Sequence, residues 1–154
     1  MRPASVLASL GASVEVSDAD LAVAALASMP GSLDYDQQEG VILAALRGRV
    51  DAVVDAVGVD FMGVVGGGPP GTLLHWAAWE GSAPVVKRLL ELGADPVAES
   101  GATYSTPLAW CYLGSSDDRG RDDVAVARML LAAGAAYEER FAEVAGGPLA
   151  SLTP

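Results

Sequence analysis

The chain has 154 residues, with 20 acidic and nine basic side chains and a net charge of −11. This length suits one domain with its own core, and the charge argues against nucleic acid and anionic membranes as partners, since both need clustered Lys and Arg. The single cysteine excludes an internal disulfide and favours a reducing compartment. We therefore expect a bacterial, cytoplasmic protein.

Residues 1–38 predict an N-terminal cap or a degenerate repeat. One short apolar helix is predicted over residues 5–10, and a second over residues 18–29, which Pro30 ends. Residues 32–40 are rich in acids and turn formers and predict a linker.

Two apolar stretches could be mistaken for targeting segments. Residues 61–79 carry no Asp, Glu, Lys or Arg, but Gly-Gly-Gly-Pro-Pro-Gly at 66–71 cannot continue the helix that a membrane span requires. The apolar run in residues 1–13 is short, and no convincing cleavage site follows it. We interpret both stretches as parts of the fold.

Residues 39–71 predict the first of three similar units. The pair Ala44-Ala45 recurs 33 residues later as Ala77-Ala78, and Gly48 recurs at the same distance as Gly81. Small paired residues let neighbouring helices approach closely, and the glycine permits a tight turn with positive φ between two helices. The glycines and prolines that end this unit predict a long, irregular connecting finger.

Residues 72–105 are the most regular unit. Its first helix is predicted to begin after Thr72 and its second to end at Gly93, a glycine that can take the left-handed conformation. Between them, Val85, Val86 and the leucines that follow lie on one face of a helix.

Residues 106–137 predict a third unit. It opens with Thr106-Pro107-Leu108, 34 residues after Thr72, and proline suits the first turn of a helix. A polar insertion at 114–123 separates its two helices. Residues 138–154 predict a closing helix, with Phe141 turned inward, and a loosely held tail.

The order Thr-x-Leu-His-x-Ala-Ala, a glycine, a second apolar run and Gly-Ala-Asp resembles the ankyrin-repeat family. The resemblance extends roughly over residues 39–137 and is strongest in 72–96. It implies an all-α fold, namely an α-solenoid of stacked antiparallel helix pairs with projecting finger loops. The third unit departs from the pattern, because Ala109 replaces the histidine and Cys111-Tyr112 replaces the alanine pair.

Members of this family mostly bind other proteins on a concave surface made by the first helices and the finger tips. The resemblance therefore implies a protein partner for a monomeric chain, with no catalytic residue, cofactor or metal. The positions before each glycine of the repeat are expected to face this groove, and in this sequence they are Leu46, Arg47, Trp79, Glu80, Tyr112 and Leu113. The residues that the motif uses for structure are His75, Gly81, Gly93, Thr106 and Pro107.

Several single residues could have a chemical or binding function, and each also has a purely structural interpretation. Trp79 either binds a partner or packs on Trp76, whereas Trp76 and Trp110, 34 residues apart, are expected in the core. His75 is the only histidine, and the motif implies that it bonds backbone groups of neighbouring loops. Cys111 is interpreted as a small buried apolar residue. The Gly-rich stretch lacks the lysine of a phosphate-binding loop.

Acidic residues gather in two places, each without the spacing of a calcium loop. We interpret both groups as solvated loops, or as a rim that selects a basic partner. They are Asp34, Asp36 and Glu39, and Asp117, Asp118, Asp122 and Asp123.

Three functions remain open from the sequence. The first is a protein-binding module that uses the groove. The second is an acidic inhibitor, such as an immunity or antitoxin protein, that blocks a basic toxin or nuclease. The third is a hydrolase that would need His75 to converge with Glu80 or Asp95 around a pocket.

Overall fold

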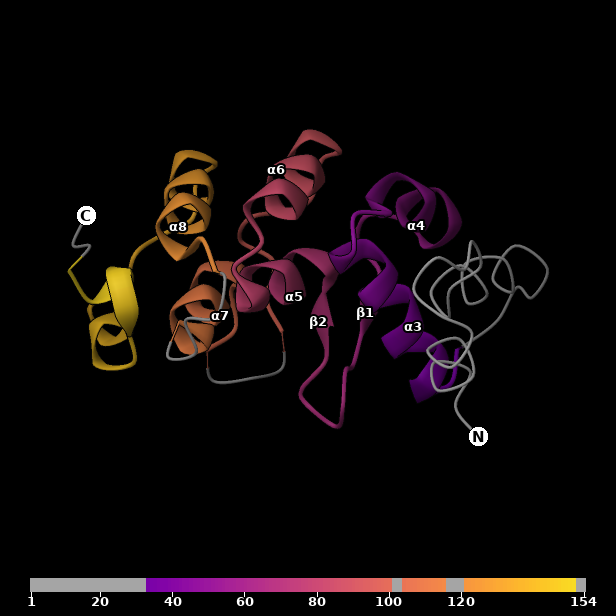
Figure 1. Cartoon of the computed structure of the whole chain (residues 1–154), viewed down its shortest axis with the longest axis horizontal. Helices are drawn as coiled ribbons and strands as arrows, with labels where there is room; N and C mark the ends of the chain where they lie inside the picture. The colour runs from indigo at the N-terminus through magenta and orange to yellow at the C-terminus, as the bar shows by residue number, and fades with distance from the viewer. Residues whose placement is uncertain (1–32, 101–103, 116–120, 152–154) are drawn as a thin grey trace.

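The structure is a computed structural model that describes residues 33–100, 104–115 and 121–151. Two rows of helices run along the molecule, with a hairpin projecting beyond one of them (Figure 1). The row beside the hairpin contains α3 (Tyr35–Leu46), α5 (Leu73–Glu80) and α7 (Pro107–Gly114). The other row contains α4 (Val50–Val57), α6 (Ala83–Glu91) and α8 (Asp123–Ala132). The helices predicted over 5–10 and 18–29 lie outside the described residues.

These helices form three pairs, each stacked on the next, so the predicted all-α solenoid is confirmed. The paired alanines Ala44-Ala45 and Ala77-Ala78 are fully buried. Their small side chains let the first helices of neighbouring pairs pack closely, and one continuous apolar core runs through the stack. No pair could bury its apolar face alone.

The first described helix begins earlier than the sequence predicts. Asp34 and Gln37 form a reciprocal capping box: the Gln37 backbone N–H donates to Asp34 Oδ1 at 2.8 Å, and the Asp34 N–H donates to Gln37 Oε1 at 3.0 Å. The prediction of a linker over residues 32–40 is therefore wrong from Tyr35 onward, where the chain is helical. Asp34 acts as an N-cap rather than as a turn former. The predicted boundary between residues 38 and 39 falls inside α3.

The finger is a short antiparallel hairpin of β1 (Met62–Gly63) and β2 (Gly71–Thr72), in which Met62 pairs with Thr72. Side chains of α3 hold the segment that follows β1. Gln38 Oε1 accepts from the Val64 N–H and Glu39 Oε1 from the Gly66 N–H, each at 3.1 Å. Glu39 is thus part of the finger's attachment and not only a solvated acid.

The C-terminal cap consists of two 3₁₀-helices, η1 (Glu139–Glu143) and η2 (Gly147–Ser151), rather than the single predicted helix. The pair of glycines before Pro148 interrupts any longer helix. Phe141 is buried as expected, but so is Leu149, which corrects the prediction of a loose tail at that residue; residues 152–154 of the predicted tail lie outside the described residues. Within the described ranges, no helix is both long and apolar enough to cross a bilayer.

Candidate functional site

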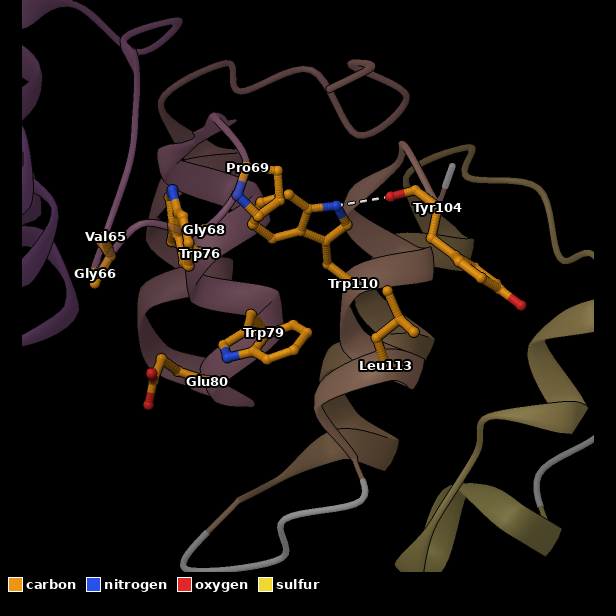
Figure 2. Close-up of a pocket in the computed structure, with 10 residues that line it drawn as sticks. All are labelled: Val65, Gly66, Gly68, Pro69, Trp76, Trp79, Glu80, Tyr104, Trp110 and Leu113. Carbon is orange, nitrogen blue, oxygen red and sulfur yellow. Dashed lines mark hydrogen bonds between the residues drawn. The ribbon is translucent and has the colours of Figure 1, made fainter. Parts of the chain in front are cut away.

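A pocket of about 590 Å³ opens between the finger and the first helices of the second and third pairs (Figure 2). Its walls come from the finger, from α5, from α7 and from the loop before α7. The lining residues are Val65, Gly66, Gly68, Pro69, Trp76, Trp79, Glu80, Tyr104, Trp110 and Leu113. The volume lies within the usual range for ligand pockets, and the lining is mainly apolar.

Three tryptophans form one side of this pocket. The ring centroids of Trp76 and Trp110 lie 4.9 Å apart in an edge-to-face arrangement, and those of Trp79 and Trp110 lie 6.2 Å apart. The Trp76 indole N–H donates to the Gly63 carbonyl at 3.0 Å, and that of Trp110 donates to the Tyr104 carbonyl at 2.8 Å. These two buried rings form a fixed floor, because their polar edges are bonded and their faces are packed.

Trp79 differs from the other two tryptophans in its exposure. Trp79 remains 39% exposed, although its ring lies close to that of Trp110. Glu80 follows it at the end of α5, is exposed and also lines the pocket. Both side chains line the open pocket, and in Figure 2 the Trp79 ring extends toward Leu113 while the Glu80 carboxylate extends the other way.

His75 is fully buried and bonded on both ring nitrogens. Its Nε2 lies 2.7 Å from the Ser105 carbonyl oxygen, and its Nδ1 accepts from the Thr72 backbone N–H at 3.1 Å. A carbonyl only accepts and a backbone N–H only donates, so the neutral ring with hydrogen on Nε2 satisfies both partners. Burial lowers the pKa of His75 and outweighs the Ser105 carbonyl, which favours the charged form.

The histidine also completes the start of α5. Thr72 Oγ1 accepts from the His75 backbone N–H at 3.3 Å, while the ring returns a bond to the Thr72 N–H, so histidine replaces the usual Glu or Gln of a capping box. Thr106 caps α7 in the same way and Pro107 occupies its first turn, but Ala109 cannot return the bond.

The end of α5 is held by the insertion that precedes α8. Arg121 donates to the carbonyl oxygens of Trp79 and Ala78, and the Asp122 N–H donates to the Gly81 carbonyl at 2.9 Å. Arg121 itself pairs with Asp123 at 2.7 Å, and both side chains are buried. A cation at a helix C-terminus is favourable, so Arg121 both stabilises α5 and fixes the backbone of Trp79.

This pair corrects the interpretation of the second acidic group. Asp123 is a buried ion-pair partner at the start of α8 and not a solvated loop residue. Asp117 and Asp118 lie outside the described residues. The sequence does not predict this pair, because Arg121 is far in the sequence from the helix end that it binds.

The glycines of the second unit have the expected left-handed backbone. Gly81 has φ of 68° and Gly93 has φ of 95°. At Gly81 a side chain would also collide, since an added Cβ would lie 2.8 Å from Asp123 Oδ1. The turn between α5 and α6 therefore needs glycine both for its conformation and for the approach of the insertion.

The structure separates the six predicted groove residues. Trp79, Glu80 and Leu113 line one pocket, whereas Leu46 is half-buried and Arg47 exposed at the end of α3, outside its lining. Tyr112 is completely buried, which corrects its assignment to the surface. The shortened Cys-Tyr-Leu-Gly segment turns this ring toward the C-terminal cap, where it packs on Phe141 with centroids 5.3 Å apart.

Sequence reasoning missed Tyr104, Val65 and Pro69 as lining residues. The Gly and Pro content of the finger predicts an irregular loop but does not indicate which of its residues face the tryptophans. Tyr104 has no motif signal at all, because its role in bonding Trp110 is carried by its backbone carbonyl.

Cys111 is buried, and burial raises the pKa of its thiol to about 12. It therefore stays protonated at neutral pH, in keeping with a packing role. In the parts of the chain that the structure describes, no three His, Cys, Asp or Glu side chains gather as metal ligands would.

Residues 72–100 match the family model described as Ankyrin repeat. No curated protein matches the sequence.

Proposed function

We propose that this chain, which belongs to the ankyrin-repeat proteins through residues 72–100, is a non-catalytic module that binds a protein partner in the groove beside its finger. Ankyrin repeats generally serve as protein–protein interaction modules. On this proposal the protein acts as a monomer in the cytoplasm, and Trp79, Glu80 and Leu113 contact the partner directly.

The observation that carries the proposal is the exposure of Trp79 at the pocket. An indole that is 39% exposed leaves a large apolar area in water, and its neighbours Trp76 and Trp110 are almost completely buried. Tryptophan is enriched among the residues that dominate binding energy at interfaces, where truncation costs about 2 kcal/mol or more. Leu46 and Arg47 would extend the contact toward the first pair.

The state of His75 supports a binding rather than a hydrolytic role. Both ring nitrogens are bonded to backbone groups or to Thr72, and the side chain is fully buried. A general base must reach the proton that it removes. His75 cannot do so without giving up a bond that joins two repeats, so the hydrolase hypothesis loses its base.

The test starts with affinity capture of a partner from an extract of the native host. Binding of the captured partner is then measured for Trp79→Ala and Glu80→Lys. We expect Trp79→Ala to weaken the affinity by about 30-fold, which corresponds to about 2 kcal/mol. The matched control is Glu91→Lys, which makes the same charge change at an exposed site on α6, in the other row of helices. Unchanged affinity in both groove variants would refute the proposal.

The net charge of −11 favours a second candidate, an acidic inhibitor that blocks a basic toxin or nuclease. Long-range attraction between opposite charges accelerates association and is screened by salt. On this alternative the captured partner is a basic toxin or nuclease, and raising the ionic strength slows association steeply. A partner of neutral or acidic charge would exclude it and leave the general binding role intact.

A further inference from the structure

We infer that the pocket beside Trp79 binds one positively charged side chain, an arginine, presented by a basic segment of the partner. The inference rests on the proposed binding role and adds the chemistry of the anchor. It follows from three features of the pocket: an exposed indole, a single carboxylate, and the lack of a cation among the described residues that line it.

The aromatic feature is the side chain of Trp79 above the packed floor of Trp76 and Trp110. The floor rings are held by hydrogen bonds to Gly63 and Tyr104, so the surface that a ligand meets is preorganised. The face of an indole attracts a cation within about 6 Å of its ring centre, and tryptophan is the best aromatic residue for this contact. Preorganisation lowers the entropic cost of binding.

The electrostatic feature is Glu80. It is the only charged side chain among the ten lining residues, and within the described parts of the chain it forms no ion pair. The nearby cation Arg121 is already paired with Asp123 and bonded to the carbonyls that end α5. The charge of the whole chain has the same sign as this carboxylate, so a cationic ligand is attracted at long and at short range.

Arginine fits this combination better than the alternatives. Its planar guanidinium stacks on an aromatic face and offers a fork of N–H donors to a carboxylate, whereas a lysine ammonium is a compact, more strongly hydrated charge. An apolar side chain could fill the same space, but it would remove water from Glu80 without providing a partner for the carboxylate. The apolar stem of arginine would lie against Pro69 and Leu113, which also line the pocket.

The experiment titrates the full chain with capped pentapeptides, each holding one test residue between pairs of glycines. The test residues are arginine, its neutral isostere citrulline, and lysine. The readout is the NMR signal of the Trp79 indole N–H, assigned by its disappearance in Trp79→Phe. We expect a saturable shift with the arginine peptide, binding about fivefold weaker with citrulline, and weaker binding at high salt.

Two variants locate the charge effect. Glu80→Gln keeps the shape of the side chain and removes its charge. It should weaken binding of the arginine peptide about fivefold and leave binding of the citrulline peptide unchanged. Glu91→Gln removes an exposed carboxylate from the other row of helices and should not change the affinity for either peptide.

The outcomes separate this inference from the proposed function. Equal binding of the arginine and citrulline peptides would make the pocket an apolar site, which overturns the inference but leaves the groove as the binding surface. No shift of Trp79 with the arginine peptide at about 10 mM would also overturn it, because the pocket would then have no measurable affinity for an arginine side chain. The proposed function itself is tested independently, by the affinity of the Trp79→Ala variant for the captured partner.

Discussion

Helices α5 and α7 begin alike, since Thr72 and Thr106 each cap their helix through the side-chain oxygen. They differ in what lies on either side of them. Helix α5 packs between α3 and α7, whereas α7 packs between α5 and the 3₁₀-helix η1. Ala77-Ala78 suits a helix with helical neighbours on both sides, and Cys111-Tyr112 suits one that faces a thinner cap.

The same contrast applies to the bonds that join neighbouring units. His75 of α5 reaches the Ser105 carbonyl just before α7, and so connects the second pair to the third. Its counterpart Ala109 makes no such bond, and no fourth repeat follows it in the described structure. Instead, Ser115 Oγ accepts from the Gly146 N–H at 2.9 Å and holds the cap. The histidine bond is thus present where the second pair joins the third, and aromatic packing takes its place beside the C-terminal cap.

The prediction with the largest expected effect concerns the aromatic packing between α7 and the C-terminal cap. Phe141→Ala would leave a cavity against Tyr112 and Tyr137, whose ring centroids lie 5.3 Å and 5.7 Å from that of Phe141. We expect a loss of about 3–5 kcal/mol in the free energy of unfolding, measured by urea denaturation. Val97→Ala, at an exposed apolar site, is the control and should change little. A loss below about 1 kcal/mol would show that η1 does not close the core.

The second prediction concerns the ion pair between Arg121 and Asp123, whose arginine also joins the third unit to the end of α5. Arg121→Met leaves the buried Asp123 carboxylate without its partner, and we expect a loss of about 3 kcal/mol or more. The double variant Arg121→Met with Asp123→Leu should recover much of this loss, because no buried charge remains. If the double variant is as unstable as the single one, the pair acts through its shape and its bonds to α5 rather than through its charge.

An exposed ion pair between the first and second units provides the comparison. Arg88 bonds Asp51 at 2.8 Å, but the two side chains are 45% and 63% exposed. Water and salt screen such a pair, so Arg88→Met should not measurably shift the urea midpoint. The hydrogen-bonded arginine nevertheless lowers the pKa of Asp51.

The third prediction is a dependence of stability on pH that comes from His75 in the second unit. Unfolded His75 takes up a proton near its ordinary pKa of about 6.5, whereas burial lowers its pKa in the folded protein. Its contribution to stability is therefore complete above that value and is lost as the pH falls below it, by up to about 1.4 kcal/mol per pH unit. Urea midpoints between about pH 7.5 and 5.5 test this. The His75→Gln variant should have a lower urea midpoint at about pH 7.5, and its midpoint should change less as the pH falls.

The sequence was most informative where the repeat is regular. The spacing of Thr72, His75 and Gly81 predicts the second pair, because capping and left-handed turns are local requirements. The Arg121–Asp123 pair and the burial of Leu149 could not be predicted, since both depend on which distant segment returns to the stack. The burial of Tyr112 is of the same kind: the motif position indicates the surface, but the missing residue in its segment and the cap decide its direction.

The last prediction concerns the hydroxyl of Tyr112. Its oxygen is buried without a hydrogen-bond partner among the described residues, and burial raises the pKa of this phenol to about 12. A buried polar group without a partner costs free energy, so Tyr112→Phe should be neutral or should stabilise the protein by up to about 1 kcal/mol. This sign is opposite to that of Phe141→Ala, although the two rings are in contact. A destabilisation would mean that the hydroxyl is bonded after all, and that the end of the stack relies on a polar contact as the second unit relies on His75.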